Sequence, residues 1–184
     1  MVDKLIIQSC RTGDRNGYRM LYNSCAPYIY AIVKNYFSNE DDRKDALQEI
    51  FAQIYLSIDR YNEDMGSFKS WISRIAVNQS ITILRKSNKI IISTSLELVD
   101  DIETDTINHL EKFSEKDLQD MLSSMPDGYK TIFLLSVIEE YSHKEIGDLL
   151  GITAETSRSQ LFRAIKWIKK NIFVQSNLMD YGLL

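Results

Sequence analysis

Apolar positions recur every three or four residues along most of the chain, which is the period of an amphipathic α-helix. This pattern predicts a short helix over residues 2–12 and a longer one over residues 15–37. Pro27 lies inside the second pattern and predicts a kink or a break there, because proline lacks the N–H that a helix interior uses. With only 7 Gly and 2 Pro among 184 residues, few turns are available, and the expected fold class is all-α.

The next predicted helix, over residues 39–58, has two stripes of different character. Its core stripe is expected to contain Leu47, Ile50, Phe51, Ile54 and Ile58. The opposite side carries Asp45, Glu49, Ala52 and Leu56, with Gln48 beside them. A leucine in an acidic, outward stripe is either one stray exposed side chain or part of a docking surface for another protein, and the pattern leaves both open.

A polar loop over residues 60–66 leads into a helix predicted over residues 68–86. The expected core stripe of this helix is Phe68, Ile72, Ile75, Ala76, Gln79 and Ile83. Beside it runs a second stripe of Trp71, Arg74, Asn78 and Arg85. An indole, an amide and two guanidinium groups in line could stack on bases and hold phosphates. Taken alone, the tryptophan fits the core better than a stacking platform.

Residues 87–113 interrupt the helical pattern and predict a flexible, acidic linker between two small helical domains. Residues 87–120 carry three basic and nine acidic side chains, so the acidity behind the formal net charge of −4 is concentrated here. The predicted order is a domain over residues 1–86, the linker over 87–113, a second domain over 114–172 and a tail over 173–184.

A helix-turn-helix is predicted in the second domain. Ser142 and Glu145 have the spacing of a capping box, which marks the start of a helix. Gly151 is placed to end that helix, because glycine readily adopts the left-handed conformation of a helix C-terminus. Thr153 can then cap a second helix over residues 154–170.

The two faces of that second helix differ sharply in charge. Its apolar face is expected to hold Ser157, Leu161, Ala164, Ile165, Ile168 and Ile172. The outward face is expected to hold Glu155, Arg158, Ser159, Phe162, Arg163, Lys166, Lys169 and Lys170. With five positive charges and one negative, this face fits a recognition helix in the DNA major groove better than a merely solvated surface.

Other classes of function find little support. The chain has no apolar run near the ~20 residues of a membrane span, and its start lacks the design of a signal peptide, so a cytoplasmic protein without direct membrane insertion is expected. Cys10 and Cys25 are expected to be reduced and buried. The histidines are not clustered, so no metal site is expected. No catalytic constellation and no cofactor motif appears, so no enzymatic activity is expected.

Two segments together resemble a known family. DALQEIFAQIYLSIDRYNEDMGSFKSWISRIAVNQSITILRK, followed after the linker by MPDGYKTIFLLSVIEEYSHKEIGDLLGITAETSRSQLFRAIKWIKK, is similar to the extracytoplasmic-function (ECF) group of sigma-70-type RNA polymerase sigma factors. The resemblance implies a factor that binds core RNA polymerase and promoter DNA. The first domain would recognise and melt the −10 element, and the second would bind the −35 element. An anti-sigma factor is a further expected partner.

The resemblance also implies roles for individual residues. The core polymerase contact would use Asp45, Leu47, Gln48, Glu49 and Leu56. The loop over residues 60–67 would capture a flipped base, and the −10 surface would comprise Arg60, Tyr61, Asn62, Trp71, Arg74, Asn78 and Arg85, with the tryptophan structural or at its border. The −35 surface would comprise His143, Lys144, Glu155, Thr156, Arg158, Ser159, Phe162, Arg163 and Lys166, the first two contacting phosphate.

This chain departs from the family pattern at several positions. Thr82 stands where an acidic residue is frequent, and Gly147 replaces the usual alanine while remaining small enough for close helix packing. Glu155 and Ser157 stand where glycine and valine are common, so the −35 sequence does not follow from the resemblance. The alternatives are a stand-alone helix-turn-helix regulator whose N-terminal helices dimerise or sense a signal, and an adaptor that does not bind DNA.

Overall fold

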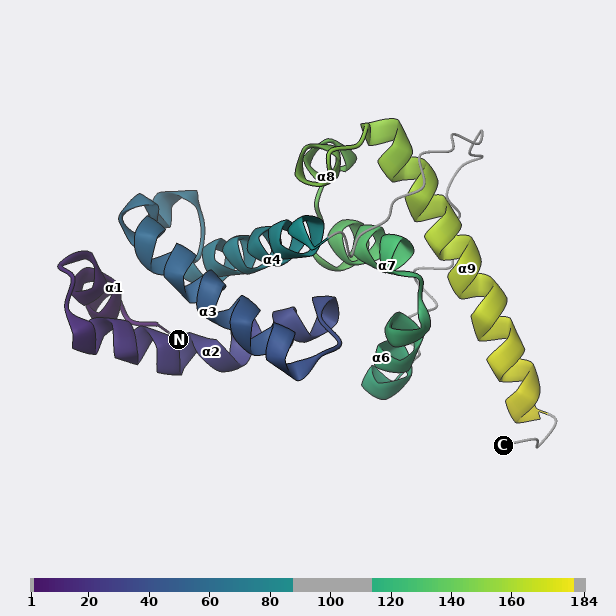
Figure 1. Ribbon diagram of the computed structural model, residues 1–184, viewed down its shortest axis with the longest axis horizontal. Helices are drawn as coiled ribbons and strands as arrows, with labels where there is room; N and C mark the ends of the chain where they lie inside the picture. Colours follow the sequence, from purple (N-terminus) through teal and green to yellow (C-terminus); the bar gives the residue numbers. More distant parts are fainter. Residues whose placement is uncertain (1, 88–113, 181–184) are drawn as a thin grey trace. The chain divides into compact units, whose positions relative to one another are not determined.

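The computed structural model describes residues 2–87 and 114–180, and within these ranges it contains helices and no strands (Figure 1). The chain divides into two compact units, the first ending at Ser87. The all-α fold class with two helical domains is therefore confirmed. The expected linker lies outside the described residues from Asn88 onward, as does the end of the expected tail from residue 181.

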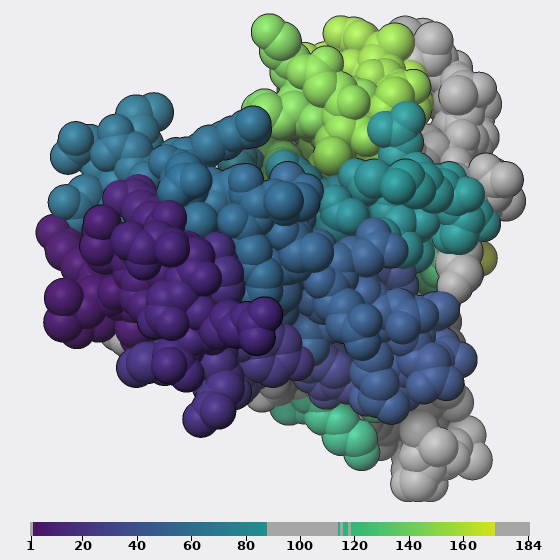
Figure 2. All heavy atoms as spheres, turned by 60° about the vertical axis from the view of Figure 1, so that its left-hand side comes forward, coloured from purple at the N-terminus to yellow at the C-terminus, as the bar shows by residue number. Residues whose placement is uncertain are grey.

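The first unit consists of α1 (Lys4–Arg11), α2 (Arg15–Tyr36), α3 (Glu40–Ser57) and α4 (Phe68–Lys86). Each helix begins at a polar residue whose side chain accepts hydrogen bonds from backbone N–H groups of the first turn, and these caps are Asp3, Asp14, Asn39 and Ser67. Helices α2, α3 and α4 pack against one another, and α1 packs against α2. Figure 2 shows α2 and α3 side by side on one face of this unit.

Of the predicted kink or break at Pro27, the break does not occur, because α2 runs through the proline as one helix. Cys25 and Ile29, on either side of the proline, are both buried, at 3% and 0% exposure. Packing on both sides of the proline offsets the hydrogen bond that its missing N–H removes. Tertiary burial therefore keeps one continuous helix where local propensity favours two.

The buried side of α4 is only partly the predicted one. Phe68, Ile72 and Ala76 are buried as expected, but Ile75, Gln79 and Ile83 are half-buried. In the second half of the helix the buried residues are Val77, Ser80, Ile81 and Leu84. Helix α4 packs against both α2 and α3. In its second half, the apolar residues next to the predicted stripe therefore face the core. Periodicity alone does not decide which of two apolar stripes on one helix is the buried one.

The second unit contains α6 (Glu115–Ser124), α7 (Asp127–Phe133), α8 (His143–Leu150) and α9 (Ala154–Asp180). A π-helical turn, η4 (Leu134–Ile138), extends α7, and its first two leucines are buried. Helices α7 and α8 pack against α9. Helix α9 continues past Lys170 into the expected tail, so the predicted end of this helix is too early.

Two further findings concern the thiols and the membrane. Cys10 and Cys25 are free and buried, as predicted, and burial raises the pKa of both thiols. Among the described helices none is long and apolar enough to span a bilayer. In the same ranges no group of three or more His, Cys, Asp or Glu side chains could hold a metal ion.

Candidate nucleic-acid and protein interfaces

The predicted docking stripe of α3 lies at the surface. Asp45, Gln48, Glu49 and Ala52 are exposed, and the side chain of Leu56 is 81% exposed. Leu47 is half-buried, so its predicted place in the core stripe is wrong, and the fully buried position is Ala46 at 1% exposure. An exposed leucine beside three exposed polar side chains forms a mixed surface suited to a protein partner.

One member of this stripe is tied to the neighbouring helix. The side-chain amide Nε2 of Gln79 donates a hydrogen bond to Oε2 of Glu49 over 3.0 Å. Gln79 belongs to α4, the helix that carries the predicted −10 surface. The bond therefore joins the predicted polymerase face directly to the predicted DNA-binding helix. No local pattern in the sequence predicts this contact, because Glu49 and Gln79 are distant along the chain.

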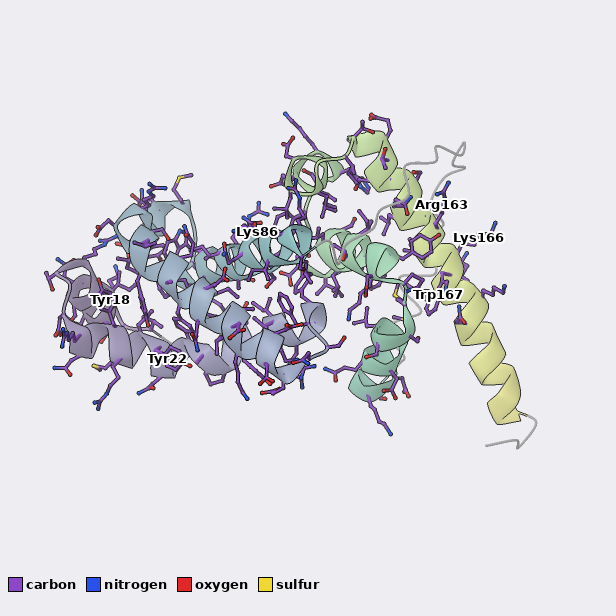
Figure 3. All side chains as sticks on the ribbon, in the orientation of Figure 1. Tyr18, Tyr22, Lys86, Arg163, Lys166 and Trp167 are labelled. Carbon is purple, nitrogen blue, oxygen red and sulfur yellow. The ribbon has the colours of Figure 1, made fainter. Side chains whose placement is uncertain are left out.

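Aromatic side chains of α2 and α3 pack beside the docking stripe. Ring centroids of Tyr18 and Tyr55 lie 4.7 Å apart, and those of Tyr22 and Phe51 lie 4.5 Å apart. The hydroxyl of Tyr55 donates to the backbone oxygen of Tyr18 over 3.3 Å, and burial raises the pKa of Tyr55 to about 12. Figure 3 labels Tyr18 and Tyr22 along α2. Tyr22 is 40% exposed, so this cluster reaches the surface.

The predicted base-capturing loop is ordered. It contains two short 3₁₀ turns, η1 (Ile58–Arg60) and η2 (Glu63–Met65). The side chain of Asn62 accepts a hydrogen bond from the N–H of Asp64 over 3.0 Å, and the hydroxyl of Tyr61 donates to the carbonyl of Gly66 over 3.2 Å. Met65 is 86% exposed, an apolar side chain that the sequence analysis did not single out in this loop.

Three of the four side chains in the predicted −10 stripe of α4 lie at the surface. Arg74, Asn78 and Arg85 are exposed, whereas Trp71 is half-buried. The Trp71 ring packs against Tyr61, with centroids 5.5 Å apart, and against Phe68, with centroids 5.4 Å apart. The tryptophan thus joins the loop to α4 through its ring contacts.

The helix-turn-helix forms as predicted. Ser142 and Glu145 make a complete capping box, in which the N–H of Ser142 donates to the Glu145 carboxylate over 2.8 Å. Gly151 ends α8 with φ 72° and ψ 37°, the left-handed conformation. The N–H of Thr156 donates to the Thr153 hydroxyl over 3.1 Å, which caps the start of α9.

Gly147 brings the two helices of the motif close together. A Cβ atom at this position would lie 2.7 Å from the backbone oxygen of Ile152, a separation that side-chain Cβ atoms essentially never show. The N–H of Ile152 also donates to the carbonyl of Gly147 over 3.0 Å. The position therefore requires glycine for the turn in its present geometry, which goes beyond the predicted need for a small residue.

His143 and Lys144 differ in their surroundings. Lys144 is exposed, whereas His143 is half-buried and its Nδ1 lies 2.9 Å from the hydroxyl oxygen of Ser157. Burial and then the nearby Arg158 guanidinium lower the pKa of His143 below 6.5. Both effects favour the neutral imidazole, and its contact with Ser157 joins α8 to α9.

The outward face of α9 is largely as predicted. Glu155, Arg158 and Lys166 are exposed, and Phe162 and Arg163 are half-exposed. Within this set an Arg158 Nη1 atom lies 3.3 Å from a carboxylate oxygen of Glu155. Both side chains of this pair are exposed, so the pair contributes little to stability and leaves the arginine available to a ligand.

Two predicted −35 residues do not lie on the exposed face. Thr156 is 6% exposed and Ser159 is 2% exposed, so the predicted outward placement of Ser159 is wrong. The Ser159 hydroxyl donates to the backbone oxygen of Thr156 over 3.0 Å. A short hydroxyl side chain bonded to the preceding turn of its own helix lies against the backbone.

Sequence reasoning did not assign Trp167 to this surface. The residue is half-buried, and it follows Arg163 by four positions, which places both on one side of α9. Figure 3 labels Arg163, Lys166 and Trp167 in succession along the helix. The i, i+4 spacing from a predicted DNA-contacting arginine was the available signal.

Comparison with known families gives one match in each unit of the chain. The profile described as Sigma-70 region 2 matches residues 21–90, and that described as Sigma-70, region 4 matches residues 115–168. The first match covers α2 to α4 with the docking stripe and the loop. The second match covers the helix-turn-helix.

Individual relatives are similar over most of their length. RNA polymerase sigma factor SigV of Bacillus subtilis is 30% identical over 146 residues, which cover 77% of this chain and 82% of the relative. The ECF RNA polymerase sigma-E factor of Haemophilus influenzae is 26% identical over 183 residues, covering 94% and 96%. The solved structure of CnrH in complex with the cytosolic domain of CnrY matches with a TM-score of 0.49 and 16% identity, over 94% of this chain and 97% of that one.

Proposed function

The chain belongs to the extracytoplasmic-function group of sigma-70-type RNA polymerase sigma factors, and from this we propose how its two units divide the work of promoter-specific transcription initiation. The observation that carries the proposal is that each unit matches a different sigma-70 region. The catalytic chemistry belongs to the polymerase, and this chain supplies binding and recognition.

We assign core polymerase docking to α3. The proposed contact comprises Asp45, Leu47, Gln48, Glu49 and Leu56. An 81% exposed leucine would be buried on docking, and the surrounding carboxylates and amide would provide hydrogen bonds and charge complementarity at the rim. This arrangement favours the docking reading of the stripe over a stray leucine.

We assign −10 recognition to the ordered loop and the polar stripe of α4. Opening a duplex costs about 1.4 kcal/mol per base-pair step in lost stacking, and flipping a base adds a few kcal/mol. Stacking of an extruded base on a protein surface returns ~1–3 kcal/mol. These magnitudes mean that a single captured base does not offset the melting of several steps. The polymerase therefore supplies the remaining stabilisation, and the loop supplies selectivity.

We assign −35 recognition to the exposed side chains at the start of α9. Arg158, Phe162, Arg163 and Lys166 provide positive charge, bidentate hydrogen-bond donors and one aromatic ring along a helix of the kind that enters the major groove. Lys144 is placed on α8 for a phosphate contact. We assign the buried Thr156 and Ser159 to local structure at the start of the helix.

Two further expectations accompany this function. Polymerase and promoter DNA are both in the bacterial cytoplasm, so the factor works there. Following the pattern of the family, we also expect an anti-sigma factor as a regulatory partner, which would compete with polymerase or DNA for the surfaces described above.

Run-off transcription with purified core polymerase tests the proposed function. Core enzyme is incubated with fragmented genomic DNA of the source organism, with and without the full-length chain, and the transcripts are sequenced from their 5′ ends. Discrete start sites that require the chain are expected. Transcription that remains confined to fragment ends in its presence would contradict the proposal.

A further inference from the structure

Two side chains of α1 reach the loop that connects α3 to α4. Nζ of Lys4 lies 2.6 Å from Oε2 of Glu63, and the guanidinium Nη2 of Arg11 donates a hydrogen bond to the backbone oxygen of Tyr61. Helix α1 also packs against η1, the first 3₁₀ turn of this loop. None of these α1 residues belongs to the surfaces assigned above.

Helix α1 is itself held firmly on the core of the first unit. Ile7 and Cys10 are buried, at 7% and 0% exposure. The hydroxyl of Ser9 donates to the Asp14 carboxylate over 2.7 Å. A Cβ atom at Gly17 would lie 2.5 Å from the hydroxyl oxygen of Ser9, so α1 and α2 approach at a distance that only glycine permits. A helix anchored in this way can hold the loop between α3 and α4 in one position through its side chains.

Tyr61 is the junction between α1, the loop and α4. Its carbonyl accepts the bond from Arg11, while its ring packs against Phe68, with centroids 5.0 Å apart and planes at 85°, and against Trp71. Its hydroxyl donates within the loop to Gly66. The guanidinium therefore holds the backbone of this residue, and the two aromatic rings hold its side chain.

We propose that α1 is a positioning element for the −10 loop, in which Arg11 fixes the Tyr61 carbonyl and so sets the orientation of the loop that captures DNA. This inference rests on the proposed −10 role of the loop. Arg11 acts on the loop backbone directly, because it is a charged donor to a carbonyl oxygen. The Lys4–Glu63 pair contributes less, since its side chains are 81% and 58% exposed and solvent screens them.

The experiment compares Arg11→Met with Arg11→Lys in the full-length chain bound to core polymerase. The probe is a fluorescent single-stranded oligonucleotide with the −10 sequence of a promoter found in the run-off assay, titrated at several salt concentrations. We expect Arg11→Met to weaken oligonucleotide binding about five- to tenfold, as for one charge-assisted hydrogen bond, and Arg11→Lys to stay within about twofold of the parent chain. Core affinity should not change.

The salt dependence separates positioning from direct contact with DNA. If Arg11 acts through the loop, log Kd should change with log salt at the same slope in Arg11→Met and in the parent chain. A slope smaller by about one would mean that Arg11 neutralises a phosphate itself, and this would overturn the proposal. Parent-like affinity of Arg11→Met, an equal loss in Arg11→Lys, or an equal loss of core affinity would also overturn it.

Two further variants complete the design. Arg19→Ala removes an exposed arginine of α2 and should leave oligonucleotide binding unchanged, which controls for general loss of positive charge. Asn62→Ala alters the loop itself. If Asn62→Ala weakens binding while Arg11→Met does not, only the positioning role of α1 fails. If neither variant has an effect, the proposed −10 role of the loop fails with it.

Discussion

The Nδ1 atom of His143 lies 2.9 Å from the hydroxyl oxygen of Ser157, and this pair joins the two helices of the helix-turn-helix. His143 is the first residue of α8, and Ser157 is a fully buried residue in the first turns of α9. The recognition helix is therefore held in part by a titratable group whose pKa is lowered by burial and by the nearby Arg158 guanidinium.

The stability of the second unit should decrease in mildly acidic solution because of this pair. A histidine whose folded-state pKa is lowered contributes stability that is fully present above the unfolded pKa near 6.5 and is lost as pH falls through the folded pKa. We expect the melting temperature of the second unit to fall between about pH 7 and pH 5. Thermal unfolding can be followed by Trp167 fluorescence in a Trp71→Phe background, since the chain has only 2 Trp.

His143→Asn is the matched control for this pH dependence. Asparagine retains a hydrogen-bonding group toward Ser157 but does not titrate, so the acid-dependent part of the decrease should be absent. A variant as acid-sensitive as the parent chain would show that other groups cause the effect.

Gly147→Ala should destabilise the second unit despite the better helix propensity of alanine. Propensity favours alanine by about 1 kcal/mol in a helix interior. The added Cβ would lie 2.7 Å from the Ile152 backbone oxygen, and overpacking of this kind costs ~1–3 kcal/mol. We expect the clash to prevail and the free energy of unfolding, measured in urea, to decrease. As a control, Asp148→Ala on the exposed side of the same helix should leave the free energy of unfolding unchanged. A Gly147→Ala variant more stable than the parent chain would contradict this prediction, because it would show that the turn can move away from the added Cβ at little cost.

Glu140→Gly should stabilise the second unit. Glu140 has φ 56°, the one non-glycine residue with positive φ among those the structure describes. The left-handed conformation costs an L-residue roughly 1–2 kcal/mol, and glycine avoids this cost but loses more entropy on folding, so a net gain of about 0.5–1 kcal/mol is expected. Urea denaturation measures it. Glu140→Ala removes the same side chain without relieving the backbone, and an equal gain there would contradict this explanation.

Local signals in the sequence predicted the turn of the helix-turn-helix. Ser142, Glu145 and Gly151 act on backbone groups within four residues, so their spacing was sufficient to place the turn of the helix-turn-helix. The outward stripe of α3, with Leu56 at its end, likewise follows from helix period alone.

Features that depend on distant partners were not predictable in this way. Gln79 was expected in the core, but its bond to Glu49 depends on how α3 and α4 meet. The burial of Ser159 and the requirement for glycine at position 147 likewise depend on packing in three dimensions. Periodicity describes one helix at a time and gives no information on which atoms of another helix approach it.

The division of labour between the two units is tested most directly by measuring two affinities for the same two variants. Leu56→Asp places a charge on the proposed docking stripe, and Arg163→Ala removes a proposed major-groove donor. Binding to core polymerase and binding of the assembled holoenzyme to a −35 duplex are titrated separately, with Arg19→Ala as the control.

We predict that Leu56→Asp weakens core binding by about 2 kcal/mol or more, as for a charge introduced at a buried interface residue. Arg163→Ala should leave core binding intact and weaken −35 duplex binding by ~1–3 kcal/mol. Equal losses of both affinities in either variant, or a parent-like core affinity for Leu56→Asp, would contradict the assignment of polymerase docking to α3 and of −35 recognition to α9.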